Sequence, residues 1–140
     1  MMPATTLVIR GGRVVTADAR GTVLEDGSVL IAGNRIVAVA ASDDPRIALA
    51  VEAGAQVIDA AGGFVLPGLI NTHTHFGMTL FRGTADDRDL QGFLAAVWPL
   101  ETAFVTADTV RLGVSIAIAE SLQAGVTTAA DMFFYPETST

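Results

Sequence analysis

The chain reads Phe64-Val65-Leu66-Pro67-Gly68-Leu69-Ile70-Asn71-Thr72-His73-Thr74-His75 near its middle, an apolar run that ends in the only two histidines of the sequence. Alternate side chains of an extended strand point to the same side, so residues two apart can aim both imidazoles at one point. Neutral imidazole is a ligand for zinc, iron, copper or nickel. The run therefore predicts a buried strand that carries a preorganised metal site at its end.

The alternative for the same pair is a solvated strand end, and a bare His-x-His pattern favours that alternative. The context changes this balance. A buried apolar strand delivers the pair to a polar, glycine-containing stretch, residues 75–88. We therefore interpret His73 and His75 as metal ligands.

The residues around this pair resemble a known family. Segments 67–75 and 78–83 resemble the first barrel strand and the following loop of the amidohydrolase superfamily. Three later segments resemble the branch of that superfamily that deaminates S-adenosylhomocysteine, methylthioadenosine and adenosine: Ala85-Asp86-Asp87, Trp98-Pro99-Leu100-Glu101 and residues 125–134. The resemblance covers essentially the whole chain.

The resemblance implies an α/β fold in two parts. Residues 1–63 are expected to form most of a small β-sandwich, and residues 64–140 the first strand, loop, helix and second strand of a (β/α)8 TIM barrel. A complete barrel takes about 250 residues and rarely fewer than about 200, whereas the chain has 140. We therefore expect an incomplete barrel, whose remaining strands come from the rest of a longer chain or from a second polypeptide.

The resemblance also implies a chemistry, which is hydrolysis of a carbon–nitrogen bond other than a peptide bond, in a cyclic amidine. One divalent ion, zinc or alternatively iron, holds a hydroxide that attacks the carbon bearing the exocyclic amine, and ammonia leaves. In the family a Glu acts as general acid and base, and two further His and an Asp complete the site. Those four residues are expected beyond residue 140. No catalytic residue is therefore expected in this chain, and its metal ligands are His73 and His75.

Glu101 and Trp98 are the candidate substrate-binding residues. The resembling deaminases bind the ribose hydroxyls with a Glu at the position of Glu101, and a carboxylate is a strong acceptor for two neighbouring hydroxyls. A solvated Glu is the alternative. Trp98 can line an apolar pocket for a purine, although packing is the commoner use of Trp. The chain departs from the branch at Phe93, where Trp is common, and at Phe76-Gly77.

Three functions fit these observations. The first is the N-terminal portion of a deaminase that acts on an adenosine-type nucleoside. The second is the same scaffold acting on another ring or leaving group, as a guanine or pterin deaminase or a triazine chlorohydrolase, because a fold does not determine its chemistry. The third is a noncatalytic fragment that acts only in assembly.

Composition limits the partners. Eight Lys and Arg stand against fifteen Asp and Glu, which gives a net charge of −7. Nucleic acids and anionic membranes bind clustered cations, so the composition argues against both. The start lacks a basic segment followed by an apolar one, and no apolar run reaches transmembrane length. We expect a cytoplasmic protein with a small purine nucleoside as substrate, and the resemblance implies a homo-oligomer of the complete enzyme.

Local patterns predict the elements of the first part. Short β-branched runs separated by glycine are typical of an antiparallel β-domain. We expect strands at 7–10, 13–16 and 28–32, a hairpin at Gly33-Asn34, one or two helical turns within 47–53, and a strand at 56–59.

In the second part, helical spacing predicts a helix over 89–97 that Pro99 stops, and a helix from an N-cap at Thr106 to a C-cap signal at Gly125. A strand over 126–130 follows. Asp131 is expected at its carboxyl end, where it either orients a neighbour of the metal site or only terminates the strand. Arg82 is expected to pair with Asp86 or Asp87.

Overall fold

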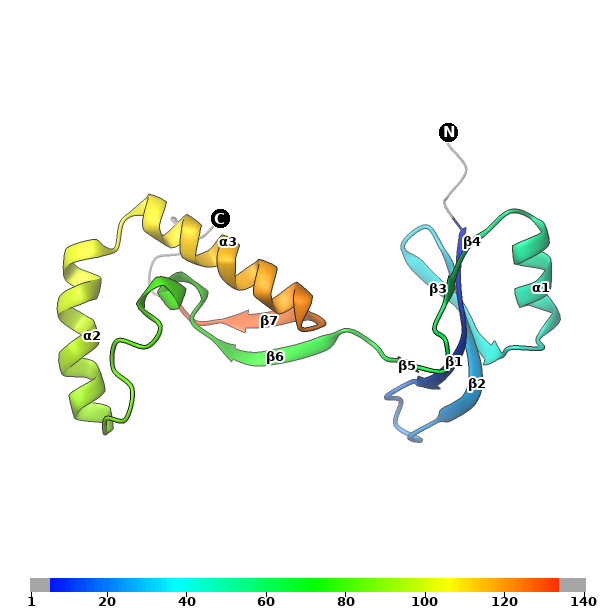
Figure 1. The fold of residues 1–140 in the computed structure, drawn as a ribbon, viewed down its shortest axis with the longest axis horizontal. Helices are drawn as coiled ribbons and strands as arrows, with labels where there is room; N and C mark the ends of the chain where they lie inside the picture. Colours follow the sequence, from blue (N-terminus) through cyan, green and yellow to red (C-terminus); the bar gives the residue numbers. More distant parts are fainter. Residues whose placement is uncertain (1–5, 134–140) are drawn as a thin grey trace. The chain divides into compact units, whose positions relative to one another are not determined.

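The computed structural model describes residues 6–133 of the chain. It divides into two compact units, one that ends at Pro67 and one that begins at Gly68. Each unit combines strands with helix (Figure 1), so the predicted α/β class is confirmed. Residues 1–5 of the first expected part, and residues 134–140 of the second, lie outside the described range.

The first unit is built on one sheet with the strand order β3-β2-β1-β4, and β5 also pairs with β1. Its elements are β1 (Thr6–Val15), β2 (Val23–Ala32), β3 (Arg35–Ala41), α1 (Pro45–Glu52), β4 (Gln56–Asp59) and β5 (Phe64–Val65). The first three strands pair antiparallel, but β4 and β5 run parallel to β1. The prediction of an antiparallel domain is therefore wrong for β4, and Phe64-Val65, predicted as the start of the barrel strand, instead forms β5 of this sheet. The connection through α1 returns the chain to the end of the sheet at which β1 begins, which makes β4 parallel to β1.

The two strands predicted on either side of Gly11 and Gly12 are one strand, β1, with an irregularity at these glycines. The register with β2 shifts on both sides of Gly12. A Cβ on Gly12 would lie 2.7 Å from the Ala60 Cβ and 2.9 Å from the Gly63 carbonyl oxygen. Gly12 therefore lets the turn between β4 and β5 approach the backbone of β1.

The other predicted elements of this unit are present, although β2 begins at Val23, five residues before the predicted start at 28. The hairpin at Gly33-Asn34 joins β2 to β3, and α1 and β4 lie where they were predicted. Asp44 caps α1, because its carboxylate accepts from the Arg46 N–H at 2.9 Å and also pairs with the Arg46 guanidinium at 2.8 Å. These contacts lower the pKa of Asp44 to about 2. The core of the unit is apolar and small: Val8, Val14, Val29, Ala38 and Ile47.

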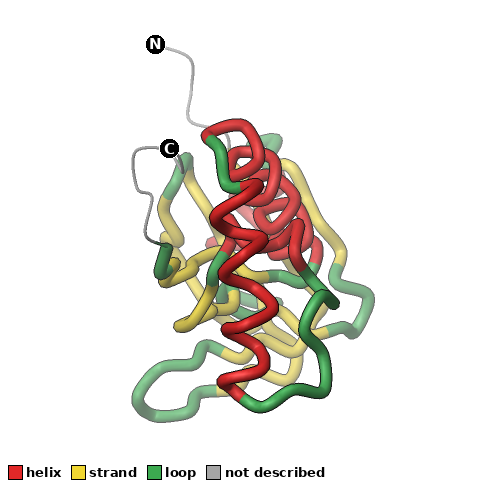
Figure 2. The backbone as a smooth tube through the Cα atoms, turned by 90° about the vertical axis from the view of Figure 1, so that its left-hand side faces the viewer, coloured by secondary structure: helices red, strands yellow, loops and turns green. Residues whose placement is uncertain are grey.

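The second unit begins with β6 (Leu69–Thr74) and ends with β7 (Val126–Asp131), and the two strands pair in parallel. Between them lie the 3-10 helix η1 (Phe76–Phe81), α2 (Leu90–Phe104) and α3 (Ala107–Gln123). Helices α2 and α3 meet at a bend of 120° (Figures 1 and 2). The predicted second strand is confirmed, and its carboxyl end lies beside that of β6.

The apolar run that opened the sequence argument is shared between the units. Its first residues form β5, which pairs with β1, and its later residues form β6, which pairs with β7. Pro67 and Gly68 separate the two strands. The first unit therefore ends at Pro67, four residues after residue 63, where the sequence predicted the end of the first part.

Helix α2 does not end at Pro99, so the predicted stop is wrong. The helix runs from the N-cap Asp89 to Phe104, with Pro99 inside it. A proline fixes φ at about −65°, a helical value, and its cost is one lost hydrogen bond and a steric clash with the preceding turn. After Pro99 the helix completes a further turn, in which the Thr102 hydroxyl donates to the Trp98 carbonyl oxygen at 2.9 Å.

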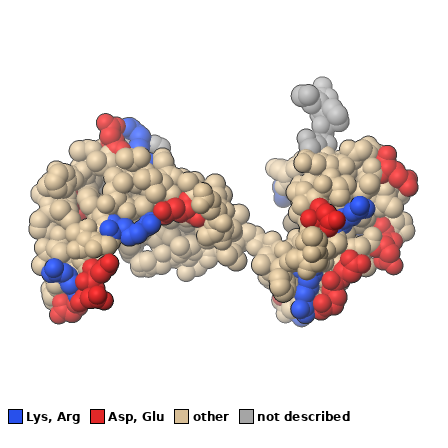
Figure 3. Space-filling model, viewed as in Figure 1, with Lys and Arg blue, Asp and Glu red and all other residues tan. Residues whose placement is uncertain are grey.

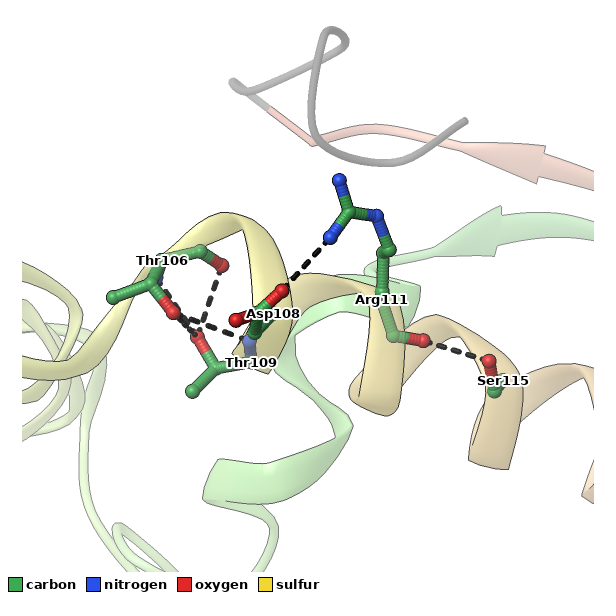
Figure 4. Close-up of polar contacts among 5 residues, drawn as sticks. All are labelled: Thr106, Asp108, Thr109, Arg111 and Ser115. Carbon is green, nitrogen blue, oxygen red and sulfur yellow. Dashed lines mark hydrogen bonds and ion pairs between the residues drawn. The ribbon is translucent and has the colours of Figure 1, made fainter.

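Helix α3 begins with the predicted N-cap (Figure 4). The Thr106 hydroxyl accepts from the Thr109 N–H at 3.2 Å, and the Thr109 hydroxyl accepts from the Thr106 N–H at 2.8 Å, which makes a reciprocal capping box. Asp108 in the first turn pairs with Arg111 at 2.8 Å. Gly125, with φ of +78°, follows the other end. Both predicted boundaries of this helix are confirmed.

Helix α3 packs closely on η1, the segment that follows His75. A Cβ on Gly113 of α3 would lie 2.8 Å from the Gly77 carbonyl oxygen, and a Cβ on Gly77 would lie 2.8 Å from the Phe133 ring. Gly77 and Gly113 are both buried. Because these two positions are glycine, the backbone that follows the histidine pair packs closely against α3 and against Phe133, which follows β7.

No single helix within residues 6–133 is long and apolar enough to cross a membrane, whereas α2 and α3 taken as a bent pair meet the criterion by length and composition only.

On the face drawn in Figure 3, the basic groups lie beside acidic ones, and most of the surface is uncharged.

Candidate metal centre

His73 and His75 bring their Nε2 atoms together at the carboxyl end of β6. The two atoms are 3.1 Å apart, and the rings stand edge to face at 84°. Two imidazole nitrogens that bind one zinc ion at about 2.0–2.1 Å are themselves about 3.1–3.4 Å apart when the angle at the metal is about 100–110°. The pair therefore fits one shared ion.

The strand reaches this geometry through an irregularity. Asn71 pairs with Ala129 and Thr74 with Asp131, so three steps along β6 match two steps along β7. His73 lies within this extra step, and its N–H donates to the Asn71 side-chain oxygen at 3.2 Å. A bulge of this kind turns side chains away from regular alternation. Regular strand geometry, which motivated the metal prediction, is thus not what aims the two rings.

His75 is oriented from its other nitrogen. Its Nδ1 lies 2.6 Å from the Met132 carbonyl oxygen. A carbonyl oxygen only accepts hydrogen bonds, so in the neutral ring the proton lies on Nδ1 and Nε2 keeps its lone pair. Metal-binding histidines are commonly held in this way by a backbone carbonyl.

Asp131 lies beside this contact, at the end of β7. Its Oδ1 accepts from the Thr74 hydroxyl at 3.0 Å and from the Phe76 N–H at 2.9 Å. It therefore joins the two residues that flank His75. The sequence indicated that Asp131 would stand at this strand end, but a single sequence has no signal that pairs it with Thr74.

A pocket of about 240 Å³ opens beside His75. Its walls are apolar, with Met78, Phe93 and Val97 among them, and Glu101 lies in its lining. The structure thus brings Glu101 and His75 to one pocket, with Glu101 half-buried. Trp98 is 60% exposed, and it is not among the described residues that line this pocket.

Arg82 has a different partner from the expected one. Its guanidinium binds both carboxylate oxygens of Glu120, at 3.0 and 2.6 Å, so the prediction of a pair with Asp86 or Asp87 is wrong. The contact lowers the pKa of Glu120 and raises the pKa of Arg82. Glu120 lies on α3, which the packing of η1 brings to Arg82. Proximity along the sequence favoured the local carboxylates, and tertiary packing overrode it.

Within residues 6–133, the acidic, His and Cys side chains form no cluster of three or more that could hold a metal ion. A zinc site takes three or four protein ligands. The described residues therefore offer two converging imidazoles, which fit part of such a site.

The chain was compared with known proteins. The model of the amidohydrolase family matches residues 64–138, more than half of the chain. A 5-methylthioadenosine/S-adenosylhomocysteine deaminase of Symbiobacterium thermophilum is 44% identical over 91% of this chain and 28% of the relative.

Two solved structures are also similar. The adenosine deaminase of Xanthomonas campestris, with bound zinc, has a TM-score of 0.76 and 35% identity over 95% of this chain and 30% of that protein. The atrazine chlorohydrolase of Arthrobacter aurescens, complexed with zinc, has a TM-score of 0.78 and 30% identity over 95% and 32%. The chain thus spans less than a third of the length of these proteins. With the family model matching more than half of its residues, the chain belongs to the amidohydrolase family.

Proposed function

We propose that this chain contributes half of the metal site of a hydrolytic deaminase that releases ammonia from an adenosine-type nucleoside: S-adenosylhomocysteine, methylthioadenosine or adenosine. The observation that carries the proposal is the pair of Nε2 atoms 3.1 Å apart at the end of a parallel strand, beside a pocket that contains Glu101. The similarity to a methylthioadenosine/S-adenosylhomocysteine deaminase and to an adenosine deaminase supports it.

His73 and His75 would hold one divalent ion through Nε2, zinc in the first place and iron as the alternative. A bound ion of this kind supplies Lewis-acid activation of a water molecule. The residues of this chain orient the ligands: the Met132 carbonyl holds the proton on Nδ1 of His75, and Asn71 holds the His73 backbone. The remaining ligands and the general acid and base come, in this proposal, from the rest of a barrel in which β6 and β7 are the first two strands.

The first unit would form part of the small β-sandwich that accompanies the barrel. Its described strands make one sheet. Large apolar side chains on β3 and β4 are exposed, with Ile36 at 66% and Ile58 at 45%. An apolar sheet face is stable when a second layer covers it. We propose that a second sheet, from the rest of the protein, provides that layer.

Glu101 would bind the ribose hydroxyls of the nucleoside. It is the carboxylate in a pocket whose walls are otherwise mainly apolar, an arrangement that suits a purine on the walls and a diol on the charged group. Trp98 is not among the described residues that line this pocket and is 60% exposed, so the proposed substrate contact is assigned to Glu101 alone.

A second candidate function is hydrolysis of a triazine ring substituent. The similarity to atrazine chlorohydrolase, with a TM-score of 0.78, favours this candidate. The two candidates differ at Glu101, because a triazine has no ribose. A ribose-binding carboxylate has no partner on such a substrate.

Ultraviolet spectra of the zinc-loaded full-length protein that carries this chain test the proposal. Incubation with each of the three nucleosides should convert the adenine spectrum to that of hypoxanthine, with release of ammonia. Spectra that stay unchanged for all three nucleosides, together with turnover of a chlorotriazine, would reject the deaminase in favour of the second candidate.

Glu101→Gln sharpens the same test. The substitution should raise KM for ribosides by about tenfold or more, because one charge-assisted hydrogen-bond acceptor is lost, while free adenine analogues keep their KM. Trp98→Phe is the matched control on the same helix, outside the pocket lining, and should leave both values unchanged. Equal losses on ribosides and on free bases would refute the ribose role of Glu101.

A further inference from the structure

The carboxyl ends of β6 and β7 are joined by hydrogen bonds that take no part in the proposed chemistry. Asp131 Oδ1 accepts from the Thr74 hydroxyl at 3.0 Å and from the Phe76 N–H at 2.9 Å. The Met132 N–H donates to the Thr74 carbonyl oxygen at 3.0 Å. We refer to these three bonds as the Asp131 bracket. One carboxylate oxygen in it binds the residues on both sides of His75.

Thr74 is suited to the bracket by its place in the strand. Thr74 stands opposite Asp131 in the register of β6 and β7, and its hydroxyl reaches the Asp131 carboxylate. It is 7% exposed, one of the two buried polar residues in the described part of the chain. The hydroxyl also lies 3.1 Å from the Ala130 carbonyl oxygen. Its single proton serves one acceptor at a time, and a carboxylate is the stronger acceptor.

The Asp131 bracket lies where the hydrogen-bond ladder between β6 and β7 ends. His75 has φ of −137° and ψ of 66°, which takes the chain out of the strand and into η1. The His75 carbonyl oxygen accepts from the Met78 N–H of η1, whereas the Phe76 N–H needs a partner outside the ladder. Asp131 provides the acceptor for the Phe76 N–H, and this anchors the His75 backbone to the end of β7.

The residue that follows β7 also orients the His75 ring. The Met132 carbonyl oxygen is the partner of His75 Nδ1 at 2.6 Å, and Met132 follows Asp131 directly. Two contacts thus tie His75 to consecutive residues of one strand end, one through its backbone neighbours and one through its ring. Movement of the backbone around His75 would break the ring contact.

We propose that Asp131 and Thr74 are positioning residues, which hold the His75 backbone so that its Nε2 meets that of His73 with the lone pair free. The inference rests on the proposed metal site, because positioning the two rings matters only if they bind one ion together. In this proposal neither residue is a ligand of the ion or a contact of the substrate. Their effect on zinc passes through the orientation and the tautomer of His75.

Two measurements on the full-length protein that carries this chain test the bracket. The first is the tautomer of His75 in the metal-free chain, from long-range ¹⁵N–¹H correlations with both imidazoles neutral. The second is the dissociation constant for zinc, from competition with a chromophoric chelator. Asp131→Ala should give His75 a mixture of tautomers and weaken zinc binding by about tenfold or more, as for other partners of metal-binding histidines.

Asp131→Asn is the conservative variant. Its amide oxygen can accept the same two hydrogen bonds without the charge, so it should keep the Nδ1–H tautomer and weaken zinc binding by only about threefold. Asp108→Asn removes an exposed carboxylate whose partner is Arg111 on α3, and it should change neither measurement. An unchanged tautomer and an unchanged zinc constant in Asp131→Ala would overturn the proposal.

Thr74 gives a second matched pair in case Asp131→Ala fails to fold. Thr74→Ser keeps the hydroxyl and should behave as the wild type, whereas Thr74→Val keeps the shape, loses the hydroxyl and should behave as Asp131→Ala. Equal behaviour of the two Thr74 variants would overturn the proposal. The tautomer readout needs no metal: a wild-type full-length protein that fails to bind zinc rejects the proposed metal site, while the tautomers of the variants still test the bracket.

Discussion

Strands β1 and β6 are each interrupted by a shift in register, and they accommodate it in opposite ways. In β1 the shift occurs at Gly11 and Gly12, where the absence of side chains lets the turn after β4 approach the backbone. In β6 the register shifts first between Leu69 and Ile70 and again between Asn71 and Thr74, and at the second shift polar side chains supply hydrogen bonds to the displaced backbone.

The difference separates two uses of an irregular strand. A shift made of glycines creates space and serves packing, because the missing Cβ leaves room for the Ala60 side chain and the Gly63 carbonyl oxygen. A shift held by Asn71, Thr74 and Asp131 changes the direction of functional side chains, because each displaced group has a partner that defines its position. The interruption of β1 should thus matter for stability, and that of β6 for metal binding.

The largest expected effect concerns the two imidazoles. His73→Asn and His75→Asn each remove one of the two converging ligands, so zinc affinity should fall by more than about 100-fold, the upper range for loss of a metal-site partner. A native mass spectrum of the purified protein reports bound zinc directly. Wild-type protein should retain one ion in the assembly that supplies the other ligands, and each variant none. If both variants retain zinc, His73 and His75 are not its ligands, and the interruption of β6 has no role in metal binding.

Gly12→Ala tests the interruption of β1. The new Cβ would lie 2.7 Å from Ala60 Cβ and 2.9 Å from a carbonyl oxygen, so the substitution should lower the free energy of unfolding by about 2 kcal/mol, as for other overpacked sites. Chemical denaturation measures this change. Zinc affinity should stay the same.

Gly21→Ala is the control for that variant. A Cβ there meets nothing within 4 Å, and only a φ of +66° opposes it, so the expected cost is about 1 kcal/mol. A Gly12→Ala variant as stable as wild type would mean that the interruption of β1 has no packing role.

Asn71→Ala tests the weaker of the polar contacts that hold the interrupted part of β6. The Asn71 oxygen accepts from the His73 N–H at 3.2 Å, a neutral hydrogen bond near the surface, so its loss should weaken zinc binding by about threefold to tenfold. Asn71→Asp keeps an acceptor at the same position and should restore the affinity. If the two variants bind zinc equally well, the acceptor has no role in aiming His73.

The smallest effect concerns an ion pair in each unit. Arg46 holds the pKa of Asp44 at about 2, and Arg82 lowers the pKa of Glu120 from its usual 4.5. A carboxyl whose folded-state pKa is depressed stabilises the fold above its unfolded-state pKa and loses this contribution as the pH falls through the folded-state value. The Asp44 contribution should therefore disappear between about pH 4 and pH 2.

Glu120 should lose its contribution as the pH falls below about 4.5. Thermal unfolding of Asp44→Asn and Glu120→Gln, each followed against pH, should show a flatter acid limb than wild type, by a small margin because both pairs are exposed. An acid limb as steep as that of the wild type in either variant would exclude that pair as a source of acid sensitivity.

Several features were predictable from the sequence because their causes are local. The two histidines lie two residues apart at the end of an apolar run, and Thr106 precedes a helix that its own side chain caps. The hairpin at Gly33-Asn34 and the strand before Asp131 depend on equally short stretches. The predicted end of the helix at Pro99 was wrong although its cause is local. Proline lowers the stability of a helix interior, but here it does not end the helix.

What the sequence determined by itself is the chemistry available: two imidazoles, the strand that carries them, and a carboxylate at Glu101. The tertiary structure decided the partners of these groups. It selected Glu120 for Arg82, placed β4 and β5 parallel to β1, and set Asp131 on both neighbours of His75. The physical reason is distance along the chain. Capping, turns and strand alternation act within a few residues, whereas hydrogen bonds between residues such as Thr74 and Asp131 form only once the strands have paired.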